Sequence, residues 1–244
     1  MSELLFFATA FIAEVIGTAI GFGSSTIFMP IALFFINFKA ALILVAFFHV
    51  FGNLGRLTFF RHGLDKKLIL LFGVPSIILT GVGAVFVKYI SQDIFKLILG
   101  IFLLIFSITT TFRPEFRFSA TKRSAIIGGG LSGFLAGLIG TGGALRGAFL
   151  IAFDLEKTRY IASAAAIAIG VDLTRIPIYL GSGFLEKKYY LYVPLLFVIA
   201  FAGSYTGRKV LTKIPQSFFR RLVLVAIALM SLKFVIDGVT NLFR

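Results

Sequence analysis

Two glycine-rich stretches decide the fold of this chain: GFGSST at residues 21–26 and GTGGAL at residues 140–145. Each interrupts a long apolar run, so each predicts a break in a membrane helix. Shifting the second half back by 119 positions superimposes the two stretches, and it also places Asp172 on Asn53 and Arg175 on Arg56. Repeats with an interrupted apolar segment at corresponding places are typical of secondary transporters, whose site lies at the repeat interface.

Composition indicates the surroundings of the chain. Of its 244 residues, 59% are hydrophobic and only 14% are charged. A water-soluble chain could not cover so much apolar surface, so we expect an all-α integral membrane protein. The net charge of +14 resides largely in short loops between apolar runs, where basic residues direct topology and contact anionic lipid. We therefore expect the lipid bilayer as a partner and no nucleic acid. There is no cysteine, and we expect neither a cofactor nor a metal site.

About eight apolar segments follow one another along the chain. They cover roughly residues 4–36, 40–60, 68–90, 94–112, 124–153, 158–180, 189–211 and 219–239. Most have the ~20 residues that a spanning helix needs. The first and fifth are too long for one simple span. Each either crosses once as a bent helix or enters and returns as a hairpin of two helical pieces.

The distribution of basic residues favours the hairpin. If all segments crossed once, the 20 Lys and Arg residues in loops would divide evenly between the two sides. With the first and fifth segments re-entrant, 14 collect on one side and 6 on the other, as the positive-inside rule requires. This topology predicts a multi-pass protein of the cell membrane with two inverted-topology repeats, residues 1–112 and 124–244. The linker 113–123 would be cytoplasmic and both termini extracytoplasmic.

The two breaks are the predicted binding site for a small anion. Non-helical backbone at membrane depth occurs only where protein or a water-filled cavity satisfies it. Helical pieces that begin there would direct free N–H groups and positive dipole ends inward. The alternative is that small residues merely let helices pack closely, as in Gly133-x-x-x-Gly137. The substrate-binding residues predicted at the breaks are Gly23, Ser24, Ser25, Thr26, Thr141, Gly142, Gly143 and Arg146.

Charged and polar residues within the apolar segments add four candidates. Arg56 and Arg175 each follow a polar residue by three positions, Asn53 and Asp172 respectively, and so share a helix face with it. A guanidinium at membrane depth is costly unless it is paired, and its planar fork matches carboxylate, sulfonate or phosphate oxygens. We predict that all four line the site. The alternatives are that Asp172 simply neutralises Arg175, and that Arg56 extends to the interface.

Three further residues receive individual roles. Arg146 follows the second break and has no basic counterpart in the first repeat, where Ile27 stands, so we predict that it contacts the substrate directly. Glu14 and His49 lie within apolar segments. Either could carry a coupling proton, because burial raises a carboxyl pKa and imidazole titrates near neutrality. Either could instead be a hydrogen-bonded packing residue, and sodium remains an alternative coupling ion.

The spacing of glycines resembles that of the TauE/SafE sulfite-exporter family, also called the toluene-sulfonate uptake permease family. The resemblance rests on Gly21-x-Gly23, Gly140-x-Gly142-Gly143, Gly81-x-Gly83-Ala84 and Gly203-Ser204-x-x-Gly207, and it covers both repeats. It implies a secondary carrier of sulfite, sulfonates, sulfoacetate or related anions. The sequence departs from the family pattern at Ser24 and Ser25, at Phe149 and at Arg146.

Two other functions are possible from the sequence. A carrier of non-sulfur carboxylates would need the same positive site. An intramembrane serine hydrolase is suggested by Gly130-Leu131-Ser132-Gly133 and His49-Val50-Phe51-Gly52, which resemble rhomboid protease motifs. A serine nucleophile needs its base within hydrogen-bond reach. The histidine here precedes the serine, in the reverse of the rhomboid order, so we expect a transporter and not an enzyme.

Overall fold

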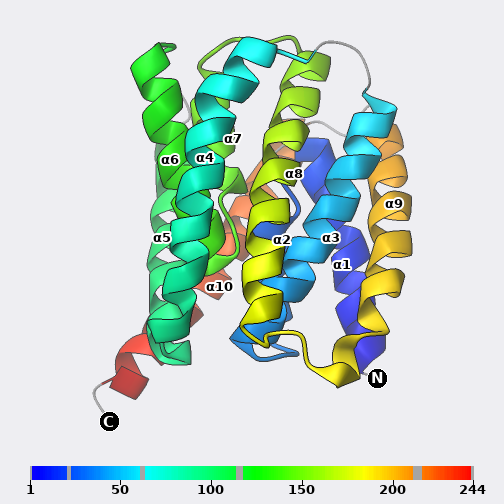
Figure 1. Ribbon diagram of the computed structural model, residues 1–244, viewed down its shortest axis with the longest axis vertical. Helices are drawn as coiled ribbons and strands as arrows, with labels where there is room; N and C mark the ends of the chain where they lie inside the picture. Colours follow the sequence, from blue (N-terminus) through cyan, green and yellow to red (C-terminus); the bar gives the residue numbers. More distant parts are fainter. Residues whose placement is uncertain (1, 21–22, 61–63, 114–117, 211–215, 243–244) are drawn as a thin grey trace.

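The computed structural model describes residues 2–20, 23–60, 64–113, 118–210 and 216–242. Within these ranges the chain forms helices and no strands, so the prediction of an all-α protein is confirmed (Figure 1). The α-helices are α1 (Ser2–Ile20), α2 (Ser25–Ala32), α3 (Phe38–Phe59), α4 (Lys66–Phe86), α5 (Gln92–Phe112), α6 (Lys122–Ile139), α7 (Gly143–Ile151), α8 (Lys157–Gly181), α9 (Tyr192–Val210) and α10 (Gln216–Leu242). Two short 3-10 helices, Val87–Tyr89 and Lys187–Tyr189, precede α5 and α9.

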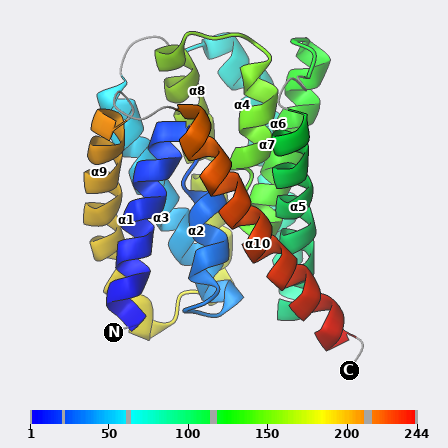
Figure 2. The same ribbon diagram turned by 180° about the vertical axis from the view of Figure 1, so that it is seen from behind.

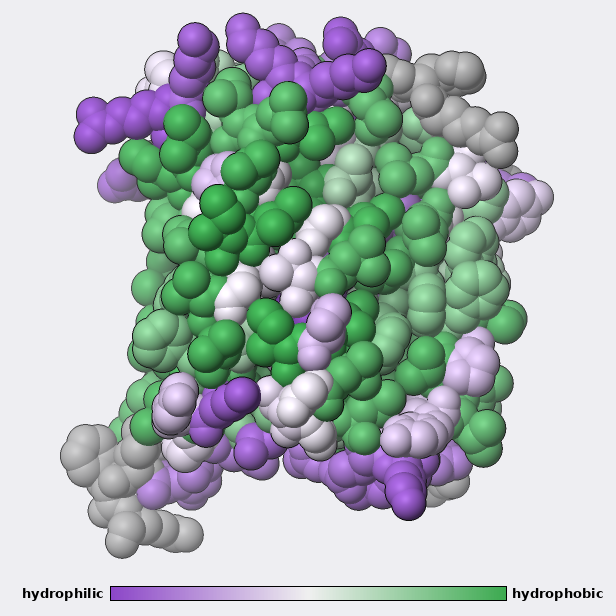
Figure 3. Space-filling model, viewed as in Figure 1, coloured by the Kyte–Doolittle hydropathy of each residue, from purple (hydrophilic) through white to green (hydrophobic). Residues whose placement is uncertain are grey.

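The surface of the bundle fits a bilayer. Figure 3 shows a face that is mainly hydrophobic through its middle, with hydrophilic residues gathered at both ends. Five segments in the described part of the chain are long and apolar enough to cross a membrane. They are Phe38–Phe59, Lys66–Tyr89, Gln92–Phe112, Thr158–Gly181 and Lys187–Lys209. The chain is therefore a multi-pass membrane protein.

The chain turns back on itself after the first break. Near the end of α1, a β-carbon at Gly17 would lie 2.5 Å from the backbone nitrogen of Ser24. Near the start of α1, the ring of Phe6 packs against Phe28 and Phe35, with centroids 5.1 and 6.0 Å away. α1 and α2 are therefore antiparallel. The first arm is about 28 Å long at 1.5 Å per residue, almost the thickness of the hydrocarbon core, whereas the eight residues of α2 form a much shorter second arm.

The second break has the same plan. α6 ends at Ile139, and its C-cap, Gly140, has a φ of +77°, a left-handed conformation that favours glycine. The ring of Phe149, near the end of α7, lies against Gly128, near the start of α6, so these helices are also antiparallel. Gly21 and Phe22 of the first predicted break lie outside the described residues.

The two hairpins open toward opposite ends of the molecule. The start of α1 and the end of α10 lie at one end, and the end of α5 and the start of α6 lie at the other (Figures 1 and 2). The last five helices accordingly run in the reverse sense to the first five.

Each half supplies a packing partner to the first helix of the other half. α6 packs against α4, and α1 packs against α9. In the first pair, a β-carbon at Gly133 or Gly137 would lie within 2.2 Å of the carbonyl oxygens of Ser76 and Thr80. Ser76 Oγ also donates a hydrogen bond to the carbonyl of Gly129 at 2.8 Å. Close helix packing therefore accounts for the glycines of α6.

Glycines of α9 perform the same role against α1. A β-carbon at Gly203 would lie 2.7 Å from Cβ of Glu14, and one at Gly207 would lie 2.8 Å from the carbonyl oxygen of Val15. α3 and α8 pack together between these pairs, and α5 packs against α10. This arrangement brings the two breaks together beside α3 and α8.

Candidate functional site

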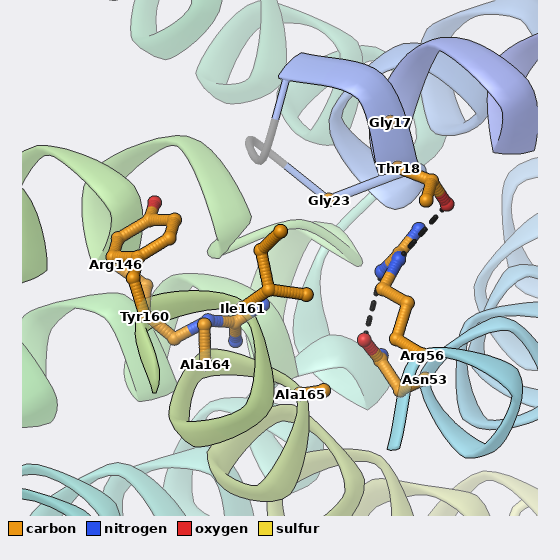
Figure 4. Close-up of a pocket in the computed structure, with 10 residues that line it drawn as sticks. All are labelled: Gly17, Thr18, Gly23, Asn53, Arg56, Arg146, Tyr160, Ile161, Ala164 and Ala165. Carbon is orange, nitrogen blue, oxygen red and sulfur yellow. Dashed lines mark hydrogen bonds between the residues drawn. The ribbon is translucent and has the colours of Figure 1, made fainter. Parts of the chain in front are cut away.

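A pocket lies where the breaks meet the ends of the long helices (Figure 4). Its space is about 300 Å³, counting the part that opens to solvent. Its lining residues are Gly17, Thr18, Gly23, Asn53, Arg56, Arg146, Tyr160, Ile161, Ala164 and Ala165. Gly23 comes from the break between α1 and α2, and the others come from the last turns of α1 and α3 and from the first turns of α7 and α8. The pocket therefore lies toward the end of the bundle where α5 ends and α6 begins (Figure 1).

One wall carries a neutralised arginine. The Arg56 guanidinium donates from Nη2 to Glu14 Oε1 at 2.6 Å and from Nε to Thr18 Oγ1 at 3.1 Å. It also donates from Nη1 to Asn53 Oδ1 at 2.8 Å. Ser204 Oγ of α9 donates to the same Glu14 oxygen at 2.7 Å. Arg56 is buried, so it does not extend to the interface, and its charge is balanced by a carboxylate.

The opposite wall carries an arginine for which no described residue provides a carboxylate at salt-bridge distance. Arg146 lies in the first turn of α7, 6% exposed, beside Tyr160 and across the pocket from Arg56 (Figure 4). Its guanidinium has no hydrogen bond or ion pair with any described residue of the chain. Burying an uncompensated cation is expensive. Arg146 is thus the residue of this region best placed to bind an anion.

Asp172 and Arg175 form a pair behind the pocket. Arg175 Nη2 lies 2.7 Å from Asp172 Oδ1, and Arg175 Nη1 donates to the carbonyl of Ala136 at 2.8 Å. That carbonyl belongs to the last turn of α6, where backbone acceptors lack partners within the helix. Neither residue belongs to the pocket lining. The structure thus gives Arg175 the pairing role that was the alternative to lining the site.

His49 links the two halves beneath Gly23. Its Nδ1 lies 2.8 Å from Asp172 Oδ2, while its Nε2 is buried and has no hydrogen-bond partner among the described residues. A β-carbon at Gly23 would lie 3.2 Å from that Nε2 and 3.7 Å from Arg146 Nη2. Gly23 also has a φ of +82°, so a side chain there would be both strained and crowded. The same point lies 3.8 Å from Cα of Gly143, so the two breaks are in contact.

The hydroxyl-bearing residues at the breaks are not among the residues that line the pocket. Thr26 Oγ1 and Thr141 Oγ1 share a buried hydrogen bond of 3.0 Å that joins one break to the other. Ser25 is buried in the first turn of α2. Ser24 lies at the N-cap of α2 without a side-chain cap bond, 3.5 Å from Arg56 Nη2. A β-carbon at Gly142 would lie 2.0 Å from the Ser132 carbonyl oxygen, so packing against α6 accounts for this glycine.

Several residues around the site were not predicted. Thr18 and Ser204 both bind Glu14. Ser204 belongs to the Gly203-Ser204-x-x-Gly207 motif, which entered only as part of the family resemblance, and Thr18 belongs to none of the quoted motifs. Nothing in the sequence singled out Tyr160 or Ile161 at the start of α8.

The hydrolase alternative finds no support in the hydrogen bonds of its two residues. Ser132 Oγ donates to the carbonyl of Gly129 at 3.1 Å, and His49 Nδ1 bonds Asp172. In the described part of the chain, no hydrogen bond joins this serine to this histidine.

Comparison with known proteins adds the family. Neither a curated protein nor a solved structure matches this chain. The family model described as "Sulfite exporter TauE/SafE" matches residues 6–234, a range that includes both breaks and every residue of the pocket. Because that match extends over most of the sequence, the chain belongs to the TauE/SafE sulfite exporter family.

Proposed function

We propose that this protein is a secondary transporter of small sulfur-containing anions such as sulfite, sulfonates or sulfoacetate. The observation that carries the proposal is the buried Arg146 guanidinium without a partner in the described chain. Glu14 balances Arg56, and Asp172 balances Arg175. Arg146 is left as an excess positive charge in the cluster. A bound anion would neutralise it, and family membership favours a sulfur oxyanion as that ligand.

The pocket chemistry suits a small oxyanion with a short apolar group. A guanidinium offers two parallel N–H donors, which match two oxygens of a sulfonate or sulfite. Ile161, Ala164 and Ala165 give the pocket an apolar side, against which the organic group of a sulfonate would pack. A carboxylate could use the same fork, so a non-sulfur carboxylate carrier is the second candidate.

Transport would proceed by alternating access between inverted repeats, residues 1–112 and 124–244. Support for this mechanism comes from the opposite directions of the hairpins and from the exchange of α1 and α6 between the halves.

At the end of the molecule where α1 begins, Asn37 Nδ2 donates to Glu186 Oε1 at 2.9 Å. Lys188 and Asn37 together hold the pKa of Glu186 below its usual value. We assign that end to the extracytoplasmic side and the linker 113–123 to the cytoplasm, so the pocket would be nearer the cytoplasm.

Purified protein in liposomes tests this function. Uptake of radiolabelled sulfite, sulfoacetate and taurine would be measured beside uptake of acetate and succinate, with Arg146→Gln as the matched site variant. We expect saturable uptake of at least one sulfur anion by wild type and a large loss in the variant. Uptake of carboxylates alone would favour the second candidate. If no anion in the panel is transported by folded wild-type protein, the proposal is wrong.

A further inference from the structure

The imidazole of His49 has a buried nitrogen for which the anion site alone gives no role. His49 is 3% exposed, and its Nε2 has no hydrogen-bond partner among the described residues. An unpartnered polar atom inside a protein is costly and calls for an explanation. The inference drawn from it rests on the proposed transport function.

The contact between the other ring nitrogen, Nδ1, and Asp172 determines the tautomer of the neutral imidazole. Asp172 is paired with Arg175 at 2.7 Å, which favours its ionised form, and an ionised carboxylate can only accept hydrogen bonds. His49 Nδ1, at 2.8 Å from Asp172 Oδ2, must therefore carry hydrogen and donate. In the neutral ring, Nε2 is then a bare lone pair. It is the position to which a proton would add.

The two buried carboxylates are poor alternatives for binding a proton. Glu14 Oε1 accepts from Arg56, from Thr18 and from Ser204, whereas Glu14 Oε2 is buried and, like His49 Nε2, has no hydrogen-bond partner among the described residues. Protonating Glu14 would leave Arg56 without its counter-ion, and protonating Asp172 would do the same to Arg175. His49 can gain a proton without breaking either arginine pair, because the imidazole is neutral and its protonation removes no negative charge from Glu14 or Asp172.

The charged residues around the imidazole determine which bound anion favours protonation of His49. Burial disfavours the protonated imidazole most strongly. Asp172 on α8 attracts the proton, whereas Arg146 on α7 and Arg56 on α3 repel it. Glu14 on α1 approaches α3 at Gly52 and is balanced by Arg56. With a neutral imidazole, the cluster carries one excess positive charge, at Arg146, which a monoanion cancels. A protonated His49 raises the excess to two, which a dianion cancels.

We propose that His49 binds the coupling proton at Nε2, so that each dianion crosses with one proton and each monoanion crosses without one. The proton comes from the water on the loading side, adds to the Nε2 lone pair, and leaves from Nε2 on the other side together with the anion. No other bond forms or breaks. A β-carbon built at Gly23 would lie 3.2 Å from Nε2 and 3.7 Å from Arg146 Nη2, so the imidazole adjoins the pocket that Gly23 lines.

The test compares a dianion with a monoanion in liposomes that contain a pH-sensitive dye. Sulfoacetate serves as the dianion and methanesulfonate as the monoanion. Wild-type protein should move about one proton with each sulfoacetate and none with each methanesulfonate, as neutralisation of the buried cluster requires. This stoichiometry needs no variant, so it can refute the proposal even if a variant fails to accumulate.

His49→Asn provides the second arm. An asparagine amide can still donate to Asp172 from near the Nδ1 position, but it has no Nε2. The variant should lose proton-linked sulfoacetate uptake while methanesulfonate exchange continues at a rate near that of wild type. His62→Asn is the matched control, because His62 is the other histidine of the chain; it should retain the wild-type stoichiometry.

The outcomes separate the two proposals. Anion uptake by wild type without proton movement would refute the role of His49 and leave the transport function standing. Equal proton movement in wild type and His49→Asn would do the same. If wild type carries neither anion nor any other member of the panel, the transport function itself fails, and the inference falls with it.

Discussion

Replacing Arg146 by glutamine separates anion recognition from folding. The substitution removes the charge and the fork but keeps a polar side chain. Because the Arg146 guanidinium has no partner among the described residues, the change breaks no hydrogen bond or ion pair seen within the chain. Its effect should therefore fall on the ligand. A charge-assisted hydrogen bond contributes about 1.5–3 kcal/mol, so we expect about a tenfold to hundredfold loss of affinity.

Arg146→Gln and Arg56→Gln should have opposite effects on stability, because Arg56 is paired with a carboxylate and Arg146 is not paired with any described residue. Arg56→Gln would leave Glu14 buried without its cation, although Thr18 and Ser204 would remain as donors. Breaking a buried pair in this way costs about 3–5 kcal/mol. Arg146→Gln relieves an unpaired buried charge, so its thermal unfolding temperature should equal or exceed that of wild type.

Titration calorimetry with sulfite and sulfoacetate, on protein shown to be folded in detergent, measures the affinity. Thermal unfolding of the same samples measures the stability. Arg146→Lys should bind with intermediate affinity, because it keeps the charge but loses the bidentate geometry. Equal affinity in wild type and Arg146→Gln would remove Arg146 from the binding site and refute the reasoning.

Three further predictions concern topology, pairing and packing. A cysteine at the exposed Ser119, in a chain without natural cysteine, should not react with an impermeant maleimide added outside intact cells; rapid labelling would invert the proposed topology. Arg175→Gln should destabilise the protein by about 3–5 kcal/mol in thermal unfolding, and adding Asp172→Asn should recover part of that loss, because the unpaired carboxylate is then gone. Gly133→Ala should lower the free energy of unfolding by about 1–3 kcal/mol, because its β-carbon would lie 2.1 Å from a carbonyl oxygen of α4. Gly181→Ala is the control and should change stability little, because no atom lies within 4 Å of its β-carbon. Equal melting temperatures of the two variants would contradict the packing argument.

The sequence predicted the helical membrane fold and the positions of the breaks because both depend on local features. Apolar length predicts spans, and glycine within an apolar run marks a break. The spacing of three residues also identified Asp172 and Arg175 as possible partners, and the structure pairs them. The sequence could not predict that His49 contacts Asp172, because these residues are 123 positions apart in the chain.

The roles of individual glycines were harder to predict from the sequence. Gly23 lines the pocket, whereas Gly142 packs against the carbonyl of Ser132. Both stand at equivalent places in their glycine-rich stretches, and a glycine that admits a ligand looks the same in sequence as one that admits a helix. The hydroxyls of Thr26 and Thr141 pose the same problem, since they bond to each other. The distinction depends on the neighbour that each break meets in three dimensions.

The exchange of first helices between the halves has a consequence for biogenesis. Synthesis proceeds from the N-terminus, so α6 enters the membrane when its partner α4 is already present. α1 has no such advantage, because α9, which supplies Ser204 to Glu14, is made near the end of translation. The first hairpin must therefore wait, with its buried carboxylate incompletely coordinated, while most of the chain is inserted. Two hairpins of the same plan thus mature at different times, because the second can pack on α4 as it is made, whereas the first lacks its partner until α9 has been inserted.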